Sequence, residues 1–292
     1  MTRLPAWQLF ALAVLIWGTT WHAITYQLGG TPPEWGVALR FSLAAAVVLA
    51  FAGWRGERLR YGLRAHGLLA LQGVFMYGLA YVCVYHAELH VPSGLVAVGY
   101  SASPVLMGLG GWALWRTPVG ARFLLGGVLG VAGVALIFWP ELADMGARPS
   151  AGLGLLFTVG AVLLSAVGAL AASRNAKAGL PFWPALGWGL AWGAVTATLI
   201  AAASQPLPDP WPTAWSWWLS LAYLAVAGTV VAFAAFLTLQ LRLGPSKAST
   251  VGVMTPVVAL AVSTLFEGYV PSVFTLAGVA LTIAGNVLML RR

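Results

Sequence analysis

Apolar runs of membrane length recur along this chain of 292 residues, and they restrict its fold more than any other feature. An α-helix rises about 1.5 Å per residue, so about 20 apolar residues cross the hydrocarbon core of a bilayer. Proline and glycine breakers separate the runs. The runs are placed at residues 7–27, 35–53, 67–86, 92–112, 122–139, 152–172, 181–203, 217–239, 246–266 and 272–290. The sequence therefore predicts an all-α integral membrane protein with ten transmembrane helices.

Composition supports this class, because 60% of the residues are hydrophobic and only 8% are charged. So few charged residues could not cover a soluble surface. Arg3 is the only basic residue before the first run, and no small-residue cleavage site follows it, so we expect a retained helix rather than a signal peptide. The single Cys83 excludes a disulfide within the chain.

The distribution of charge predicts the orientation in the membrane. With a cytoplasmic N-terminus, the outer loops hold one basic residue, Arg148, and the inner segments hold thirteen. These are Arg3, Arg55, Arg58, Arg60, Arg64, Arg116, Arg122, Arg174, Lys177, Arg242, Lys247, Arg291 and Arg292. Basic residues favour the cytoplasmic side, so we expect a multi-pass protein of the inner (plasma) membrane with both termini cytoplasmic. The formal charge of +8 then indicates contact with anionic lipid, and nucleic-acid binding is not required.

Landmarks of the first half recur in the second half at a constant offset of 152 residues. They are Pro104 and Pro256, Gly126 and Gly278, and Gly133 and Gly285. A duplication of five helices gives a second copy of opposite orientation, which is a transporter architecture. We therefore expect two inverted five-helix repeats, residues 1–145 and 146–292, around a central cavity. Gly126, Gly130 and Gly133, with Gly278 and Gly285, predict close helix packing in the fifth and tenth spans.

Several short motifs carry a family resemblance. They are Trp-Gly-Thr-Thr-Trp at residues 17–21, Ala-Leu-Arg-Phe at 38–41, Leu-Phe-Glu-Gly at 265–268, and the two prolines above. Together with the ten spans, they resemble the EamA family of the drug/metabolite transporter (DMT) superfamily. Length and aromatic content are most similar to YddG-type exporters of aromatic amino acids. The chain departs from repeat symmetry at two pairs of corresponding positions. Trp115 in the first half corresponds to Glu267 in the second, and Arg40 in the first half corresponds to Trp192 in the second.

The resemblance implies export of aromatic and other small apolar amino acids, or similar metabolites, by alternating access. No Asp or Glu lies in the core of a span, so facilitated diffusion is the simpler mechanism. The alternative is export of another metabolite or drug coupled to protons. A membrane-embedded enzyme is disfavoured because nucleophile, nucleotide-binding and paired-acid motifs are missing from the sequence. A membrane receptor that does not transport remains an alternative. We expect no cofactor. The expected partners are a small-molecule substrate and the lipid bilayer. The sequence does not determine the oligomeric state, and a monomer is compatible with it.

Depth along the spans predicts the substrate site. Several aromatic and polar residues lie about 12–16 Å from the start of their helices, near the midplane where transporters bind their solutes. Rings and a soft sulfur would contact an apolar side chain, and hydroxyls would hold a zwitterion weakly. The predicted substrate-binding residues are Trp17, Tyr77, Tyr81, Tyr100, Ser101, Ser103, Thr229, Phe233, Met254 and Thr255.

Other polar residues and prolines are predicted to gate or to support the structure. They are His22, Arg40, Glu88, Pro104, Pro256 and Glu267. A buried Arg40 needs a partner, and we expect an ion pair with Glu88 or Glu34, with capture of a substrate carboxylate as the second choice. His86 and His90 could share a helix face, but the spacing does not match a zinc motif, so no metal site is predicted.

Overall fold

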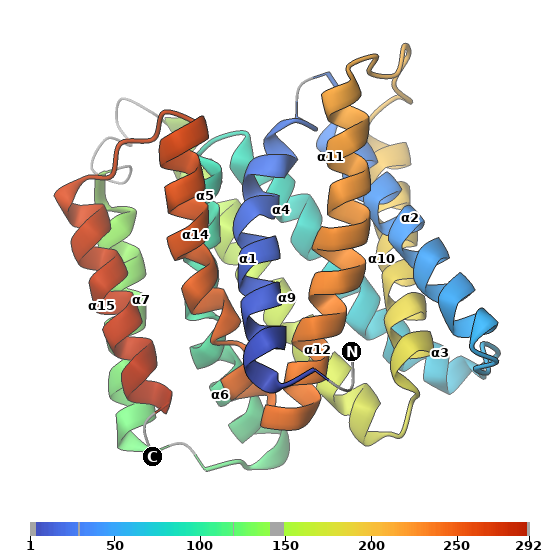
Figure 1. Ribbon diagram of the computed structural model, residues 1–292, viewed down its shortest axis with the longest axis horizontal. Helices are drawn as coiled ribbons and strands as arrows, with labels where there is room; N and C mark the ends of the chain where they lie inside the picture. The colour runs from blue at the N-terminus through green and yellow to red at the C-terminus, as the bar shows by residue number, and fades with distance from the viewer. Residues whose placement is uncertain (1–3, 29, 119, 141–148, 291–292) are drawn as a thin grey trace.

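The computed structural model describes residues 4–28, 30–118, 120–140 and 149–290, and this part of the chain is an upright bundle of helices (Figure 1). Some expectations fall outside the described residues. They are the repeat boundary between residues 145 and 146 and the charges at Arg3, Glu141, Asp144, Arg148, Arg291 and Arg292.

Five spans make up the first half, and two of them are composite. They are α1 (Ala6–Thr25), α2 (Pro33–Trp54), α3 (Leu63–Gly73) continued by η1 (Val74–Leu79) and α4 (Ala80–Glu88), α5 (Ser93–Gly99) continued by η2 (Tyr100–Ala102) and α6 (Ser103–Trp115), and α7 (Ala121–Ile137). The segment η1 is a π-helix and η2 is a 3-10 turn. Both lie in the middle of their spans, where the proposed site was expected.

The second half repeats this plan. Its spans are α9 (Pro149–Lys177), α10 (Phe182–Ser204), α11 (Trp215–Ala225) continued by the π-helix η3 (Val226–Val231) and α12 (Ala232–Leu243), α13 (Pro245–Ala248) followed by α14 (Val251–Phe266), and α15 (Val273–Leu290). Within the described residues, eight helical stretches are long and apolar enough to cross a membrane, and α7 and α15 are shorter apolar helices. The predicted all-α membrane protein with ten helices is confirmed.

Local chemistry explains where the helices begin and end. Pro33 and Pro245 occupy the first turns of α2 and α13, where a missing backbone N–H costs no hydrogen bond. Gly179 and Gly244 follow α9 and α12 with φ of +77° and +85°. Residues that carry a Cβ rarely adopt this backbone conformation. These breakers keep the connections short and set neighbouring spans antiparallel.

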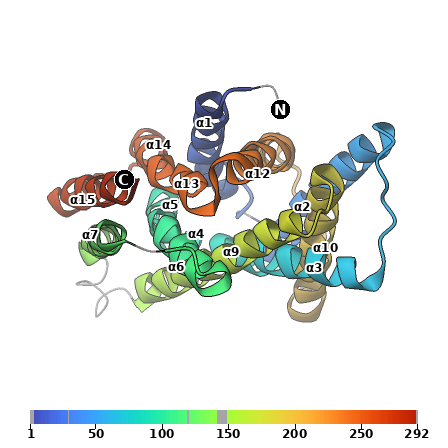
Figure 2. The same cartoon turned by 90° about the horizontal axis from the view of Figure 1, so that it is seen from below.

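The helices α7 and α15 pack backbone to backbone at one edge of the bundle, with α2 and α10 toward the opposite edge (Figure 2). A Cβ added at Gly126 would lie 2.3 Å from the carbonyl oxygen of Gly285, and one added at Gly133 would lie 2.6 Å from that of Gly278. The close packing predicted for these glycines is confirmed. A Cβ at Gly130 would meet nothing nearer than Asn286 Nδ2 at 3.8 Å.

The offset of 152 residues recurs in three dimensions. The π-helices Val74–Leu79 and Val226–Val231 are separated by this offset at both ends. The glycine contacts are reciprocal, because Gly126 meets the counterpart of Gly133, and Gly133 meets the counterpart of Gly126. In addition, α1 begins at the end of the bundle where α9 finishes (Figure 1). These observations support the division that we propose, two inverted repeats of residues 1–145 and 146–292.

Candidate functional site

A cavity lies between the two halves, and its walls come from the spans that contain α1, α4 and α6 and from their counterparts α9, α12 and α14. The centre of a water molecule can occupy about 80 Å³ of it. One water needs roughly 10–15 Å³ by this measure, so the cavity has room for several waters or a small solute. We call the end of the bundle at which α1 begins the inner end, and the opposite end the outer end.

The structure places many of the predicted substrate-binding residues together in this cavity. They are Trp17, Tyr81, Tyr100, Ser103, Phe233 and Thr255. Trp17 is held by a hydrogen bond of 3.1 Å from its ring nitrogen Nε1 to the carbonyl of Gly228. Tyr100 and Ser165 are joined through their hydroxyl oxygens at 3.0 Å. These bonds fix two rings and leave their faces toward the cavity.

Tyr77 and Thr229 belong to the protein core and are not among the cavity-lining residues, contrary to the prediction. Tyr77 is fully buried, its hydroxyl accepts a hydrogen bond of 3.3 Å from Gln72 Nε2, and its ring meets that of Phe233 edge-on at 4.9 Å. Thr229 is also fully buried, and its hydroxyl oxygen accepts a hydrogen bond of 3.0 Å from Nε of Arg40. Internal bonds therefore occupy both polar groups.

Ser101 and Met254 lie outside the set of cavity-lining residues too. The Ser101 hydroxyl faces the neighbouring span and donates to the carbonyl of Gly252 at 3.4 Å. Met254 is 38% exposed and is not among the residues that line the solute cavity. Depth along a helix fixes a level and leaves the direction of the side chain open, so residues at the predicted depth can lie outside the cavity wall.

Sequence reasoning missed the remaining residues of the cavity wall. They are Thr20, Trp21, Ile24, Met76, Met107, Ser165, Ala166, Ala169, Phe236, Ser249 and Gly252. One signal could have found part of this set. Ala169 and Gly252 stand 152 residues after Trp17 and Tyr100, so a transfer of the predicted residues across the duplication would have included them.

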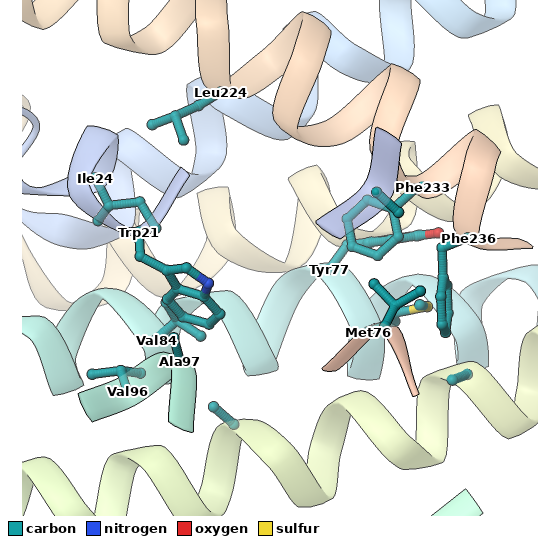
Figure 3. Close-up of a cluster of buried hydrophobic side chains, with 14 of the residues drawn as sticks. Trp21, Ile24, Met76, Tyr77, Val84, Val96, Ala97, Leu224, Phe233 and Phe236 are labelled. Carbon is teal, nitrogen blue, oxygen red and sulfur yellow. The ribbon is translucent and has the colours of Figure 1, made fainter. Parts of the chain in front are cut away.

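Aromatic rings form much of the cavity wall, in two groups. Among the buried side chains drawn in Figure 3, Trp21 lies apart from Phe233 and Phe236. The ring of Trp17 lies 5.0 Å from that of Phe233 and 5.3 Å from that of Phe236. Farther along the cavity, Trp21 and Tyr100 are 5.3 Å apart between ring centroids. These separations are those of attractive aromatic pairs. The rings on the cavity surface can therefore add contacts to an apolar or aromatic part of a solute.

The described residues that line the cavity include no Asp, Glu, His, Lys or Arg. Their polar groups are hydroxyls, the Trp indoles and backbone amides. Behind the wall lies Arg40, whose guanidinium carbon is 4.6 Å from the centroid of the Tyr81 ring. A solute in the cavity therefore meets neutral dipoles first and one cation through an aromatic ring.

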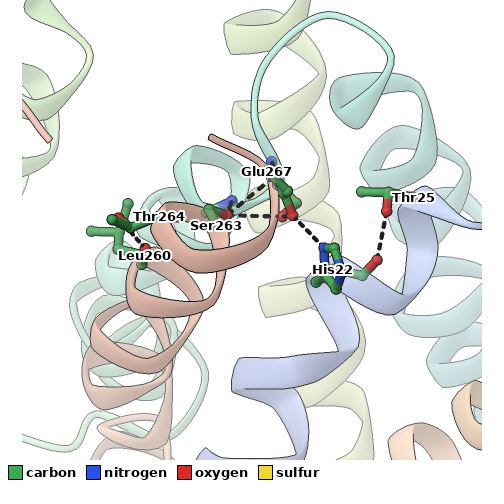
Figure 4. Close-up of polar contacts among 8 residues, drawn as sticks. His22, Thr25, Leu260, Ser263, Thr264 and Glu267 are labelled. Carbon is green, nitrogen blue, oxygen red and sulfur yellow. Dashed lines mark hydrogen bonds and ion pairs between the residues drawn. The ribbon is translucent and has the colours of Figure 1, made fainter. Parts of the chain in front are cut away.

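A polar network joins three spans at the outer end, above the cavity (Figure 4). His22 Nδ1 on α1 and Glu267 Oε1 after α14 are 2.9 Å apart. Glu267 also accepts hydrogen bonds from the Ser93 hydroxyl at 2.5 Å, from the Ser93 backbone N–H at 3.3 Å, and from the Ser263 hydroxyl at 3.2 Å. The side chains of His22 and Glu267 are both mostly buried, so this network can hold the outer end closed.

The expected ion pair between Arg40 and Glu88 or Glu34 is wrong, because none joins these residues in the described part of the chain. The Arg40 side chain is bonded to Thr229 and lies against the Tyr81 ring instead. Glu34 is taken by His86, at 2.8 Å from Nε2. Both carboxylate oxygens of Glu88 are buried without a hydrogen-bond partner among the described residues.

The histidines at 86 and 90 share an aromatic contact. Their rings stack on Phe157, with centroid distances of 5.1 Å and 6.3 Å. The described residues contain no group of three or more His, Cys, Asp and Glu side chains that could hold a metal ion. His86 and Glu34 form a pair at the outer end, and they bring no third ligand with them.

The two counterpart prolines lie in different local settings. Pro104 is in the first turn of α6, directly after the 3-10 turn η2, whereas Pro256 is inside α14. A proline inside a helix removes a backbone donor and bends the helix. A gating role for these two prolines, as opposed to simple curvature of their helices, stays a prediction. Ser103 and Thr255, which precede them in the sequence, line the cavity.

A ten-helix bundle with a neutral, aromatic cavity between two similar halves defines a polytopic membrane transporter. The chain belongs to the EamA-like transporter family, whose model matches it twice, at residues 5–139 and at residues 152–291. The predicted EamA membership within the drug/metabolite transporter superfamily is therefore confirmed, and the YddG-type subclass stays a prediction.

Curated relatives and one solved structure are similar to the chain along most of its length. Protein PecM of Dickeya dadantii is 24% identical over 87% of this chain and 82% of its own. The uncharacterized inner membrane transporter YedA of Escherichia coli K12 is 29% identical over 89% of this chain and 82% of its own. A crystal structure of another protein, 22% identical, aligns over 97% of this chain and 95% of its own with a TM-score of 0.71, which indicates a common fold.

Proposed function

We propose that this transporter exports amino acids with aromatic or other small apolar side chains, or similar zwitterionic metabolites, by facilitated diffusion with alternating access. One observation carries the proposal. The cavity between the halves offers ring faces and hydroxyls but no ionised side chain among its described lining residues. Neutral groups hold a zwitterion without a buried counter-ion, so the solute can leave again. We expect an affinity in the millimolar range, about 4 kcal/mol.

Contacts at the two ends support alternating access. At the outer end, Glu267 binds His22 across α1 and α14. At the inner end, Trp115 receives the ammonium of Lys177, with Nζ 3.7 Å from the ring centroid. Trp115 is the residue 152 positions before Glu267, so corresponding positions make a contact at each end. Breaking one contact while keeping the other would open the cavity to one side only.

Cytoplasmic termini are part of the proposal. The end of the bundle at which α1 begins is also the end at which α15 finishes (Figure 1). The ends of spans there carry Arg55, Arg58, Arg174 and Lys177, which favour the cytoplasmic face. Export then means loading at the inner end and release at the outer end.

Proton coupling is the second candidate, and the pair of His22 and Glu267 is the observation that favours it. Coupling would use the imidazole of His22 as the proton carrier at this outer contact. A pH gradient imposed on proteoliposomes without a solute gradient separates the candidates. Facilitated diffusion predicts no sustained uphill accumulation, and such accumulation would establish coupling.

The proposed function is tested by flux of labelled L-phenylalanine and L-alanine in proteoliposomes. Tyr100→Ala removes a ring from the cavity wall, and we expect L-phenylalanine flux to fall about fivefold more than L-alanine flux, because one aromatic contact contributes about 1 kcal/mol. Met254→Ala is the matched control, since Met254 lies on the exposed surface. If Tyr100→Ala leaves the flux ratio unchanged, or Met254→Ala alters it equally, the cavity does not select the side chain.

A further inference from the structure

Arg40 on α2 is a fully buried cation behind the wall of the central cavity. It is not one of the residues that line the cavity. We propose that the charge of Arg40 selects solutes that carry a carboxylate and turns that end of the solute toward Tyr81, with no direct contact between the guanidinium and the solute. The inference deepens the proposed function and rests on it, because it places the solute in the central cavity.

The charge of Arg40 has no ion-pair partner among the described residues. Its Nε donates to the Thr229 hydroxyl at 3.0 Å, and its two terminal nitrogens make no hydrogen bond within the described part of the chain. Glu88 is within electrostatic range of Arg40, but its carboxylate oxygens are not bonded to the guanidinium. A buried cation of this kind is weakly screened, because little water surrounds it.

The ring of Tyr81 connects Arg40 with the cavity. The guanidinium carbon lies 4.6 Å from the centroid of this ring, a distance at which a cation is attracted to an aromatic face. Tyr81 itself lines the cavity. One aromatic side chain on α4 therefore separates the cation from a solute, and an aromatic ring screens a charge far less than water does.

The guanidinium also approaches the cavity from the side of α1. A Cβ added at Gly228 would lie 3.4 Å from Nη2 of Arg40 and 2.6 Å from Cγ2 of Thr20. Nη2 and this methyl group are therefore no farther apart than the sum of these two distances. Thr20 lines the cavity, and the carbonyl of Gly228 holds the ring of Trp17 in the cavity wall. Arg40 thus lies behind the part of the wall that Tyr81 and Thr20 form.

A positive charge behind one part of the wall makes the two ends of a zwitterion unequal. The described lining residues include no ionised side chain that could offset this charge from within the cavity. A carboxylate is therefore favoured near Tyr81 and Thr20, and an ammonium group is disfavoured there. Because Arg40 is already buried, a solute that binds does not have to strip water from the cation, so the attraction stays compatible with release.

Three ligands with one carbon skeleton test the selection on the unmodified protein. They are 3-phenylpropionate, 3-phenylpropionamide and 3-phenylpropylamine, which differ only in the charge and polarity of one end. Thermal unfolding of the solubilised protein over a range of ligand concentrations gives an apparent Kd for each. We expect the acid to bind about tenfold tighter than the amide, and the amine to bind most weakly. Equal Kd values for acid and amide would overturn the inference.

Variants of Arg40 test whether this residue is the source of the preference. In Arg40→Gln the ratio of the amide Kd to the acid Kd should fall to about one, because the charge is lost, whereas Arg40→Lys should retain a preference for the acid. A purely structural role would weaken both ligands alike and leave the ratio unchanged, which would contradict the proposal.

Arg55→Gln is the matched control. It removes the same charge from an exposed pair just after α2, about 22 Å along the helix from Arg40, and the ratio should stay as in the unmodified protein. An equal fall of the ratio in Arg55→Gln would mean that net charge, and not Arg40, selects the acid. These measurements report binding and not flux, so failure of amino-acid export and failure of carboxylate selection are distinguishable.

Discussion

The outer and inner ends of the bundle place different chemistry on corresponding positions. Glu267 at the outer end is a mostly buried carboxylate with His22, Ser93 and Ser263 around it. Its counterpart at the inner end, Trp115, meets the exposed side chain of Lys177 through a ring face. The backbone plan is common to both ends, whereas the strength of the contact is set by the side chains.

The difference in strength can be stated in energy. A hydrogen bond to a charged group contributes about 1.5–3 kcal/mol, and a cation–π contact at an exposed site contributes about 0.5–1 kcal/mol. The outer closure should therefore be the more stable of the two. This asymmetry would support the export proposed above, because a carrier that rests closed on the outside keeps its cavity available to solutes from the inner end.

The largest expected effect concerns the close contact between α7 and α15, the last helix of each half. Gly126→Ala forces a methyl group to within 2.3 Å of a backbone oxygen, so we expect a loss of about 3 kcal/mol in the free energy of unfolding. Unfolding in mixed micelles measures it. Gly130→Ala is the matched control on the same helix, because its methyl group would have space, and no loss is expected. Equal losses would mean that the reciprocal glycine contact has no special role.

A smaller effect is expected at the outer network. Glu267→Ala leaves His22 and two serines without their acceptor, and the free energy of unfolding should fall by about 2 kcal/mol. The same titration in micelles measures it. The control is Glu57→Ala, which breaks the more exposed pair of Arg55 and Glu57 and should cost less than about 1 kcal/mol. If both substitutions cost the same, the outer network is not a closure.

The smallest effect is expected at the inner contact. Trp115→Leu keeps an apolar side chain but removes the ring face under Lys177, so stability should fall by only about 0.5 kcal/mol. Unfolding of this variant beside Glu267→Ala gives the comparison directly. A loss at Trp115 as large as that at Glu267 would show that the two ends are equally strong and would remove the asymmetry argued above.

The sequence predicted the helices well because bilayer thickness and backbone hydrogen bonding leave few alternatives to an apolar helix of about 20 residues. It also predicted part of the cavity wall, where large rings such as Trp17 and Phe233 lie at mid-depth. Tyr77 shows why the rest failed. We placed Tyr77 and Tyr81 in one site by their depth along the span, but Tyr77 lies in the π-helix Val74–Leu79, where α-helical geometry does not set the direction of the side chain.

The sequence also could not predict which side chains pair with one another. The sequence offers two anions near Arg40, and no pattern tells that His86 takes Glu34 while Thr229 receives the guanidinium. Such choices depend on side-chain direction across spans far apart in sequence.

The paired π-helices also bear on the history of the chain. A π-helical turn holds more residues than an α-helical one, and such turns most often enter a helix as a local bulge. Because Val74–Leu79 and Val226–Val231 occupy the same place in each half, the simplest history is that the bulge was inherited once, before the halves were joined. In that history the ancestral gene encoded five helices, and two of its products met in opposite orientations through one self-complementary glycine face.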